Sequence, residues 1–138
     1  VENQEEAERR IPYLLSAAAQ VRFLSCEPLL GPISLRSDWI PGKLHWIIAG
    51  GESGPKARPS NPEWFRALRD QCGSAGLAFH FKQWGNWSPE HGREAYSTKR
   101  TQLYGESGIQ NLIHLGKKES GRELDGRTWD DLPRRASP

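Results

Sequence analysis

Apolar and polar positions alternate in a way that predicts an α/β sheet in the first part of the chain. Three short apolar runs end at residues that stop a strand, and they cover residues 21–26, 44–49 and 77–81. A helical pattern over residues 62–71 separates the last two runs, with Trp64, Phe65 and Leu68 on one face. Strands separated by a crossover helix favour parallel pairing, so we expect three parallel neighbours with this helix on their outer face.

Capping residues mark where the helices begin. Asn61 followed by Pro62 is typical of an N-cap and first helical position. Charged residues 5–10 suit an earlier helix capped by Asn3. Pro12 is expected to end that helix and to begin a second, short one.

Residues 86–138 have a different pattern. They are rich in glycine, serine and charge, and only residues 110–115 look like a strand. We expect a loop-rich tail that wraps the domain, because it carries five anchors that a disordered tail seldom has: Trp87, Tyr96, Tyr104, Ile113 and Trp129. The chain thus divides into a domain over residues 1–85 and a tail over residues 86–138.

Charge and hydropathy show whether the sequence supports either of two partners, nucleic acid or a membrane. The 19 basic and 17 acidic residues nearly cancel and form no basic stripe, so binding to nucleic acid gains no support from charge. No apolar run is long enough to span a bilayer, and no signal peptide is visible, so we expect a cytoplasmic protein without membrane contacts.

Two features bear on completeness and metal binding. Cys26 and Cys72 lack metal-ligand spacing, so we expect two reduced, buried thiols and no metal site. The chain starts at Val1, contains no methionine and leads at once into a charged helical stretch. We interpret it as a fragment that begins near the end of a missing strand.

Four blocks of sequence resemble an uncharacterised family of phage and prophage proteins, and they cover residues 22–32, 50–59, 81–85 and 121–129. Full-length members of that family carry an N-terminal three-cysteine motif similar to the cluster-binding loop of radical S-adenosylmethionine enzymes. In those enzymes three thiolates hold a [4Fe–4S] cluster. The resemblance implies that this chain is the C-terminal half of a TIM-like partial (β/α) barrel. The cluster and S-adenosylmethionine would then belong to the parent protein, and the missing N-terminal half would be the partner of this chain.

Strand ends are where a barrel of this kind places its working residues. Glu27 follows the first strand, Glu52 follows the second, and Lys82 lies at the end of the third. Alternation along the third strand also predicts that His80, Lys82 and Trp84 share one face. We expect the two carboxylates and the ammonium to meet at one rim, either as a structural network or as the wall of a ligand site.

Neighbouring residues extend this candidate site. By analogy with radical enzymes, the resemblance assigns cofactor contacts to Glu27, Gly50, Gly51, Glu52, Ser53 and Lys82. Glycines at a strand end permit close approach of the backbone to a ligand. Substrate or anion contacts are predicted for Arg58, Gln83 and Trp84, and no catalytic residue is assigned. Arg58 has the alternative of pairing with Glu52, and Trp84 that of covering the fold.

Two functions remain open at this point. The first is a wall of the cofactor and substrate mouth in a radical S-adenosylmethionine-like protein, inactive in the isolated chain. The alternative is a non-catalytic phage-encoded binding module that contacts nucleic acid or a protein through its tryptophan-rich tail.

Overall fold

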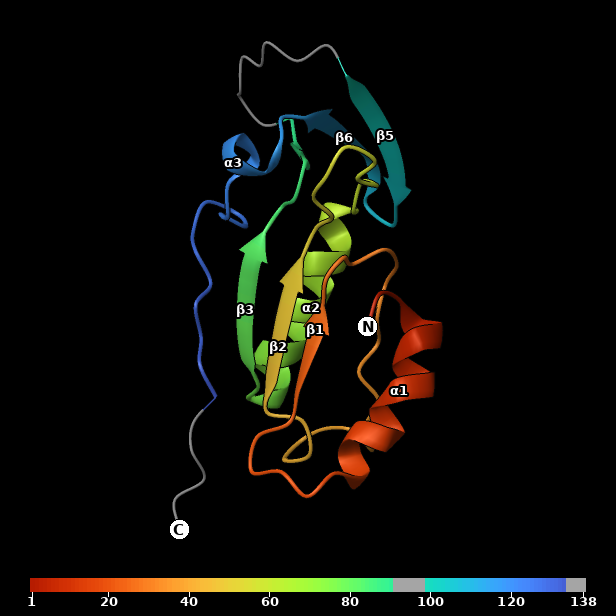
Figure 1. The fold of residues 1–138 in the computed structure, drawn as a ribbon, viewed down its shortest axis with the longest axis vertical. Helices are drawn as coiled ribbons and strands as arrows, with labels where there is room; N and C mark the ends of the chain where they lie inside the picture. Colours follow the sequence, from red (N-terminus) through yellow and green to blue (C-terminus); the bar gives the residue numbers. More distant parts are fainter. Residues whose placement is uncertain (91–98, 134–138) are drawn as a thin grey trace.

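The computed structural model describes residues 1–90 and 99–133. Tyr96, one of the five predicted anchors, lies outside these residues. Nine helices and strands, α1–α3 and β1–β6, make up the described part. They form one layered body with a small second sheet beyond the carboxyl ends of the first (Figure 1).

The three predicted strands are parallel neighbours. They are β1 (Phe23–Cys26), β2 (Trp46–Gly50) and β3 (Ala78–Gln83), in the order β1-β2-β3. Parallel pairing sets Phe23 opposite Trp46 and Trp46 opposite Ala78. The α/β architecture and the parallel pairing of the three strands are therefore confirmed. The sheet formed by the described residues is open and does not close into a barrel.

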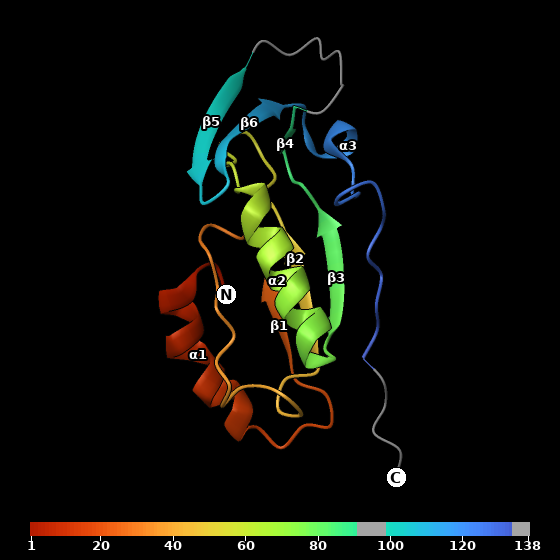
Figure 2. The same ribbon diagram turned by 180° about the vertical axis from the view of Figure 1, so that it is seen from behind.

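Helix α2 (Pro62–Ala75) covers one face of this sheet (Figure 2). Its start is the predicted cap, because the Glu63 amide donates to Asn61 Oδ1 at 2.9 Å. Phe65 and Leu68 are fully buried, and Trp64 is half-buried against the same core. The helix continues beyond residue 71 and stops where Gly76 adopts the left-handed conformation, with φ of 67°.

Helix α1 (Gln4–Ser16) is continuous, so the prediction of a break at Pro12 is wrong. Asn3 caps it as expected, accepting the Glu6 amide at 3.0 Å. Proline in a helix interior removes one hydrogen bond, but tertiary packing outweighs that local cost. Ala7 and Ile11, one turn apart on the packed face, are fully buried in the core.

The tail contains more regular structure than the single strand predicted from its sequence. Three strands, β4 (Trp87–Pro89), β5 (Arg100–Gly105) and β6 (Gly108–His114), form an antiparallel sheet in the order β4-β6-β5, followed by α3 (Lys117–Ser120). Trp87 and Ile113 are buried as expected, and Trp129 is half-buried. Tyr104 is 78% exposed, so its prediction as an anchor is wrong. It faces outward because β5 and β6 form a hairpin with one solvent-facing side.

None of the helices formed by residues 1–90 and 99–133 has the length and apolar character needed to cross a bilayer.

Candidate functional site: the carboxyl ends of the parallel strands

Glu27 is the centre of the polar cluster at the strand ends. Lys82 Nζ donates to Glu27 Oε2 at 2.8 Å, and Gln83 Nε2 donates to Glu27 Oε1 at 2.8 Å. The contact joins the end of β1 to the end of β3, on either side of β2. Of the three groups predicted to meet at one rim, Glu27 and Lys82 form a direct ion pair. The Glu27 side chain is 20% exposed and that of Lys82 is 51% exposed, so solvent reaches this ion pair.

A register shift in β3 explains why two neighbouring residues reach the same carboxylate. Ala49 pairs with Phe81, but the next residue, Gly50, pairs with Gln83. Lys82 is thus the extra residue of a bulge, which breaks the alternation of faces. The sequence-based prediction that Trp84 shares a face with His80 and Lys82 is wrong for this reason.

Gln83 is the most deeply buried polar member of the cluster, at 6% exposure. Its Nε2 also lies 3.2 Å from the Gly51 carbonyl and 3.4 Å from Ser53 Oγ. Its Oε1 is buried and accepts no hydrogen bond from the described residues. An unpaired buried acceptor costs about 1–3 kcal/mol. The cluster therefore retains one acceptor that a ligand donor group can satisfy after a local rearrangement.

Glu52 does not join this cluster. Its Oε2 accepts the Arg58 amide at 2.7 Å and Arg58 Nε at 2.9 Å, and its Oε1 accepts Arg58 Nη2 at 2.7 Å. The hydrogen bonds from the Arg58 side chain and amide hold the pKa of Glu52 at about 2. The pairing left open as the alternative for Arg58 is the one found, and it fixes the loop between the two residues.

The two strand-end glycines face the protein itself. A Cβ added at Gly50 would lie 3.1 Å from the Glu27 carboxylate. A Cβ at Gly51 would collide with the backbone carbonyl of Trp84. The sequence predicts close approach of the backbone to a ligand, and in this structure the close neighbour of Gly51 is the turn that follows β3. Gly50 additionally leaves room for Glu27 to lie over the end of β2.

Trp84 packs into the core and is 5% exposed. Its ring centroid lies 5.3 Å from that of Phe65 and 4.9 Å from that of Phe81, and its indole N–H donates to the Glu123 carbonyl at 2.8 Å. The indole offers no open face to a ligand in this conformation. Covering the fold, the alternative weighed from the sequence, is what this geometry supports.

Asn86 supports the site, and sequence reasoning missed it. Its Nδ2 donates to the Gly54 carbonyl at 2.8 Å, and its backbone carbonyl accepts the amide of Leu115 at 2.9 Å. Asn86 thereby ties the loop that contains Ser53 to the segment that follows the second sheet. The partners are about 30 residues away in the chain, so no local spacing signals the role.

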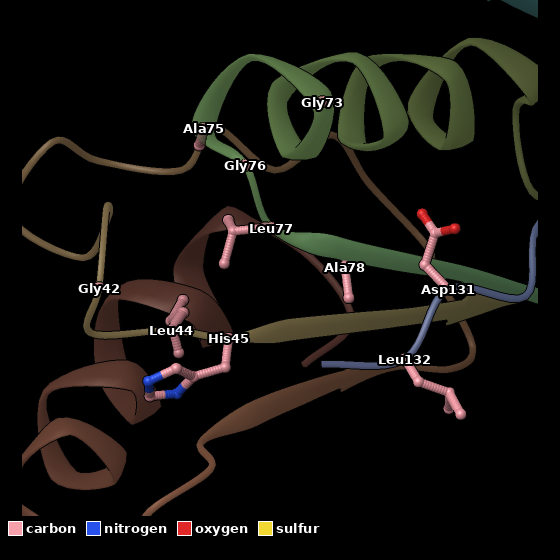
Figure 3. A pocket seen from close by; sticks show the side chains of 10 residues that line it. All are labelled: Gly42, Leu44, His45, Gly73, Ala75, Gly76, Leu77, Ala78, Asp131 and Leu132. Carbon is pink, nitrogen blue, oxygen red and sulfur yellow. The ribbon is translucent and has the colours of Figure 1, made fainter. Parts of the chain in front are cut away.

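Elsewhere in the described residues, neither a groove at the amino ends of the strands nor the two thiols contributes to this site. A groove of about 570 Å³ at the amino ends of the strands includes His45 and Asp131 in its lining and contains none of the predicted site residues (Figure 3). Within residues 1–90 and 99–133, no group of three or more potential ligands is arranged for a metal ion. Cys26 and Cys72 are buried, and burial raises the pKa of both thiols to about 12.

Comparison with known proteins identifies the family of the chain. No curated protein and no solved structure matches it. Residues 1–133 match a family described as protein of unknown function (DUF5131). The match covers both sheets and every residue of the strand-end cluster, and on this evidence the chain belongs to the DUF5131 family.

Proposed function

We propose that this chain forms the C-terminal part of a phage-derived, radical S-adenosylmethionine-like protein and lines the mouth where cofactor and substrate bind. The observation that carries the proposal is the Glu27 cluster. A carboxylate at the end of β1 is oriented by Lys82 and Gln83 from β3, beside a buried acceptor that receives no hydrogen bond from residues 1–90 and 99–133. Perturbed or unsatisfied polar groups at strand ends are typical of ligand sites.

The donor and acceptor set suits a ligand rich in hydrogen-bond donors. Glu27 and Gln83 Oε1 are acceptors, and the exposed Ser53 hydroxyl lies beside them on the loop after β2. S-adenosylmethionine offers an ammonium group and ribose hydroxyls that match these acceptors. When bound near a reduced cluster, it supplies a carbon radical. The residues of this chain bind and orient the ligand.

The iron–sulfur cluster itself does not fit the thiols of this chain. A cluster of this type needs three thiolates. The chain has two cysteines, and both are buried as neutral thiols on separate elements, Cys26 on β1 and Cys72 on α2. Cluster ligands in the proposal belong to the N-terminal half of the parent protein, and the isolated chain is expected to bind no cluster.

The face of the parallel sheet away from α2 supports the partial-barrel part of the proposal. Near the amino ends of the strands this face is apolar, with Phe23, Trp46 and Ala78 side by side in register. At the carboxyl ends it holds the ion pair of Glu27 and Lys82. Parallel sheets are normally covered on both faces, so further polypeptide is expected here. A graded face of this kind suits the inside of a TIM-like (β/α) barrel, apolar below and polar at its mouth. A cytoplasmic location belongs to the same proposal.

Anaerobic reconstitution of the full-length protein tests the proposal. We expect cluster absorbance and binding of S-adenosylmethionine, whereas the isolated chain shows neither cluster nor cofactor cleavage. Glu27→Gln should weaken cofactor binding by about 5- to 150-fold without loss of the cluster, as expected for a charge-assisted hydrogen bond of ~1–3 kcal/mol. Asp38→Asn is the matched control, because Asp38 forms an ion pair with Arg36 in which both side chains are 54% exposed.

Two results would contradict the proposal. A full-length protein that binds no cluster would remove the radical-enzyme component, and equal cofactor affinity in Glu27→Gln would remove the residue from the site. Binding of single-stranded nucleic acid instead of the cofactor would favour the non-catalytic alternative.

A further inference from the structure

The two outer edges of the parallel sheet are built differently. On the β3 edge, the segment of residues 121–132, called the strap below, runs antiparallel to the strand. Phe81 N–H donates to the Trp129 carbonyl at 2.9 Å, and Asp131 N–H donates to the Phe79 carbonyl at 3.2 Å. Phe79 N–H lies 3.3 Å from Asp131 Oδ2. The strap therefore uses the hydrogen-bonding groups with which β3 would otherwise pair to another strand.

The strap is anchored to α2 and to itself. The Trp129 ring is contacted by two guanidinium groups, that of Arg69 at 5.2 Å and that of Arg127 at 3.7 Å. Its indole N–H donates to the Leu124 carbonyl at 3.0 Å, and Leu124 is fully buried. Asp125 accepts hydrogen bonds from Arg69 and from Arg66 on α2. These contacts make the strap a fixed part of the fold that closes the β3 edge.

The β1 edge is not closed by a strand of the described residues. The His45 amide donates to the Arg22 carbonyl at 2.9 Å from the β2 side. Because a strand presents its backbone groups to alternate sides, the amides of Phe23 and Ser25 point to the outer edge. The Val1 nitrogen already donates to the Ser25 carbonyl there, at 2.8 Å.

Helix α1 has the position of a crossover whose first strand is not among the described elements. The first residues of the chain lie beside the carboxyl end of β1. There the Glu2 carbonyl accepts the amides of Leu30 and Gly31, which follow β1, at 2.7 and 3.1 Å. The chain then runs through α1 to the amino end of β1 (Figure 1). A helix that connects these two ends is the middle of a βαβ unit, which joins parallel strands.

We propose that the outer edge of β1 is the docking surface for a parallel β-strand, supplied by the polypeptide that leads into Val1. This inference rests on the proposed function and adds to it which edge of the sheet takes the further strands of the partial barrel. The strap blocks growth at β3, so the partial barrel extends from β1 alone and remains open at β3. Phe23, 46% exposed on β1, would then be covered by the same polypeptide.

Amide hydrogen exchange followed by NMR tests this on the chain itself. We expect the amides of Phe79 and Phe81 to be protected at least about 100-fold more than those of Phe23 and Ser25. Equal protection at both edges would overturn the proposal. In the full-length protein the Phe23 and Ser25 amides should become protected, and continued rapid exchange there would also overturn it.

A strap variant and an oligomer measurement complete the test. Trp129→Ala should release the Phe79 and Phe81 amides and leave those of Phe23 and Ser25 unchanged, whereas Leu132→Ala, at a side chain 71% exposed, is the control. Protection of the β1 edge that rises with protein concentration, together with a dimer in sedimentation, would assign the edge to a second copy and contradict the proposal. None of these readouts depends on a cofactor, so failure of the radical-enzyme hypothesis leaves them valid.

Discussion

The two faces of the parallel sheet differ in chemistry and in what they contribute. The face toward α2 is apolar along the length of the strands. Its buried side chains include those of Leu24, Ile47, Phe79 and Phe81. The opposite face changes from Phe23 and Trp46 at one end to an ion pair at the other. One face therefore supplies stability. The other carries the groups that have exposed or unsatisfied atoms, as expected of a surface that binds something.

We expect the largest effect in the free energy of unfolding when an aromatic side chain is removed from one face or from the other. Phe81→Ala should reduce the free energy of unfolding by about 3–5 kcal/mol, because it leaves a cavity beside Phe65 and Trp84. Phe23→Ala should cost less than about 1.5 kcal/mol, because the Phe23 side chain is already 46% exposed. Chemical denaturation of both variants measures the difference. Equal losses would show that the outer face is also part of the stabilising core of the isolated chain.

A second, smaller effect concerns Lys82, the neighbour of Phe81 in sequence. Lys82→Met should change the free energy of unfolding by less than about 1 kcal/mol, since the ion pair with Glu27 is solvent-accessible. The same change should weaken cofactor binding in the full-length protein, because Glu27 loses the group that orients it. A loss of stability as large as that of Phe81→Ala would make the cluster structural rather than functional.

The sequence predicts the framework better than the site, and the reason is physical. Apolar runs and capping residues such as Asn61 act locally, so they predict the strands, α2 and the meeting of Glu27 with Lys82. The bulge at Lys82 depends on pairing between strands. The two residues after it are Gln83, which contacts the Glu27 carboxylate, and Trp84, which is buried in the core. No local pattern contains that information.

The second sheet and α2 give the same lesson. Glu63, at the start of α2, accepts the amides of Glu106 and Ser107 at 2.8 and 3.0 Å, and so fixes the β5–β6 turn to the helix. These residues are more than 40 positions apart. Hydrogen bonds from the Ser107 side chain and these amides hold the pKa of Glu63 below its usual range. The sequence predicts an acidic residue in the first turn of a helix and gives no sign of the hairpin it holds.

The smallest expected effect is a pH-dependent loosening of the loop that Glu52 and Arg58 hold together. The folded-state pKa of Glu52 is about 2 and its ordinary value is 4.5. The pair therefore contributes fully above pH 4.5, and its contribution is lost as the pH falls from 4.5 through 2. The Arg58 amide and Nε resonances of the folded protein should titrate in NMR with a midpoint at about pH 2. Glu52→Gln should abolish the transition, and a transition that persists in this variant would assign it to another group.

A ligand site at the ends of the parallel strands is tested most directly by the side-chain amide signal of Gln83 during titration of this chain with S-adenosylmethionine. Gln110 provides the internal comparison, because its amide donates to Glu63 at 3.2 Å in a cluster that no ligand is proposed to enter. We expect a saturable shift at Gln83 that is lost in Glu27→Gln, with the Gln110 signal unchanged. An unchanged Gln83 signal, or an equal shift at Gln110, would contradict a ligand site at the ends of the parallel strands.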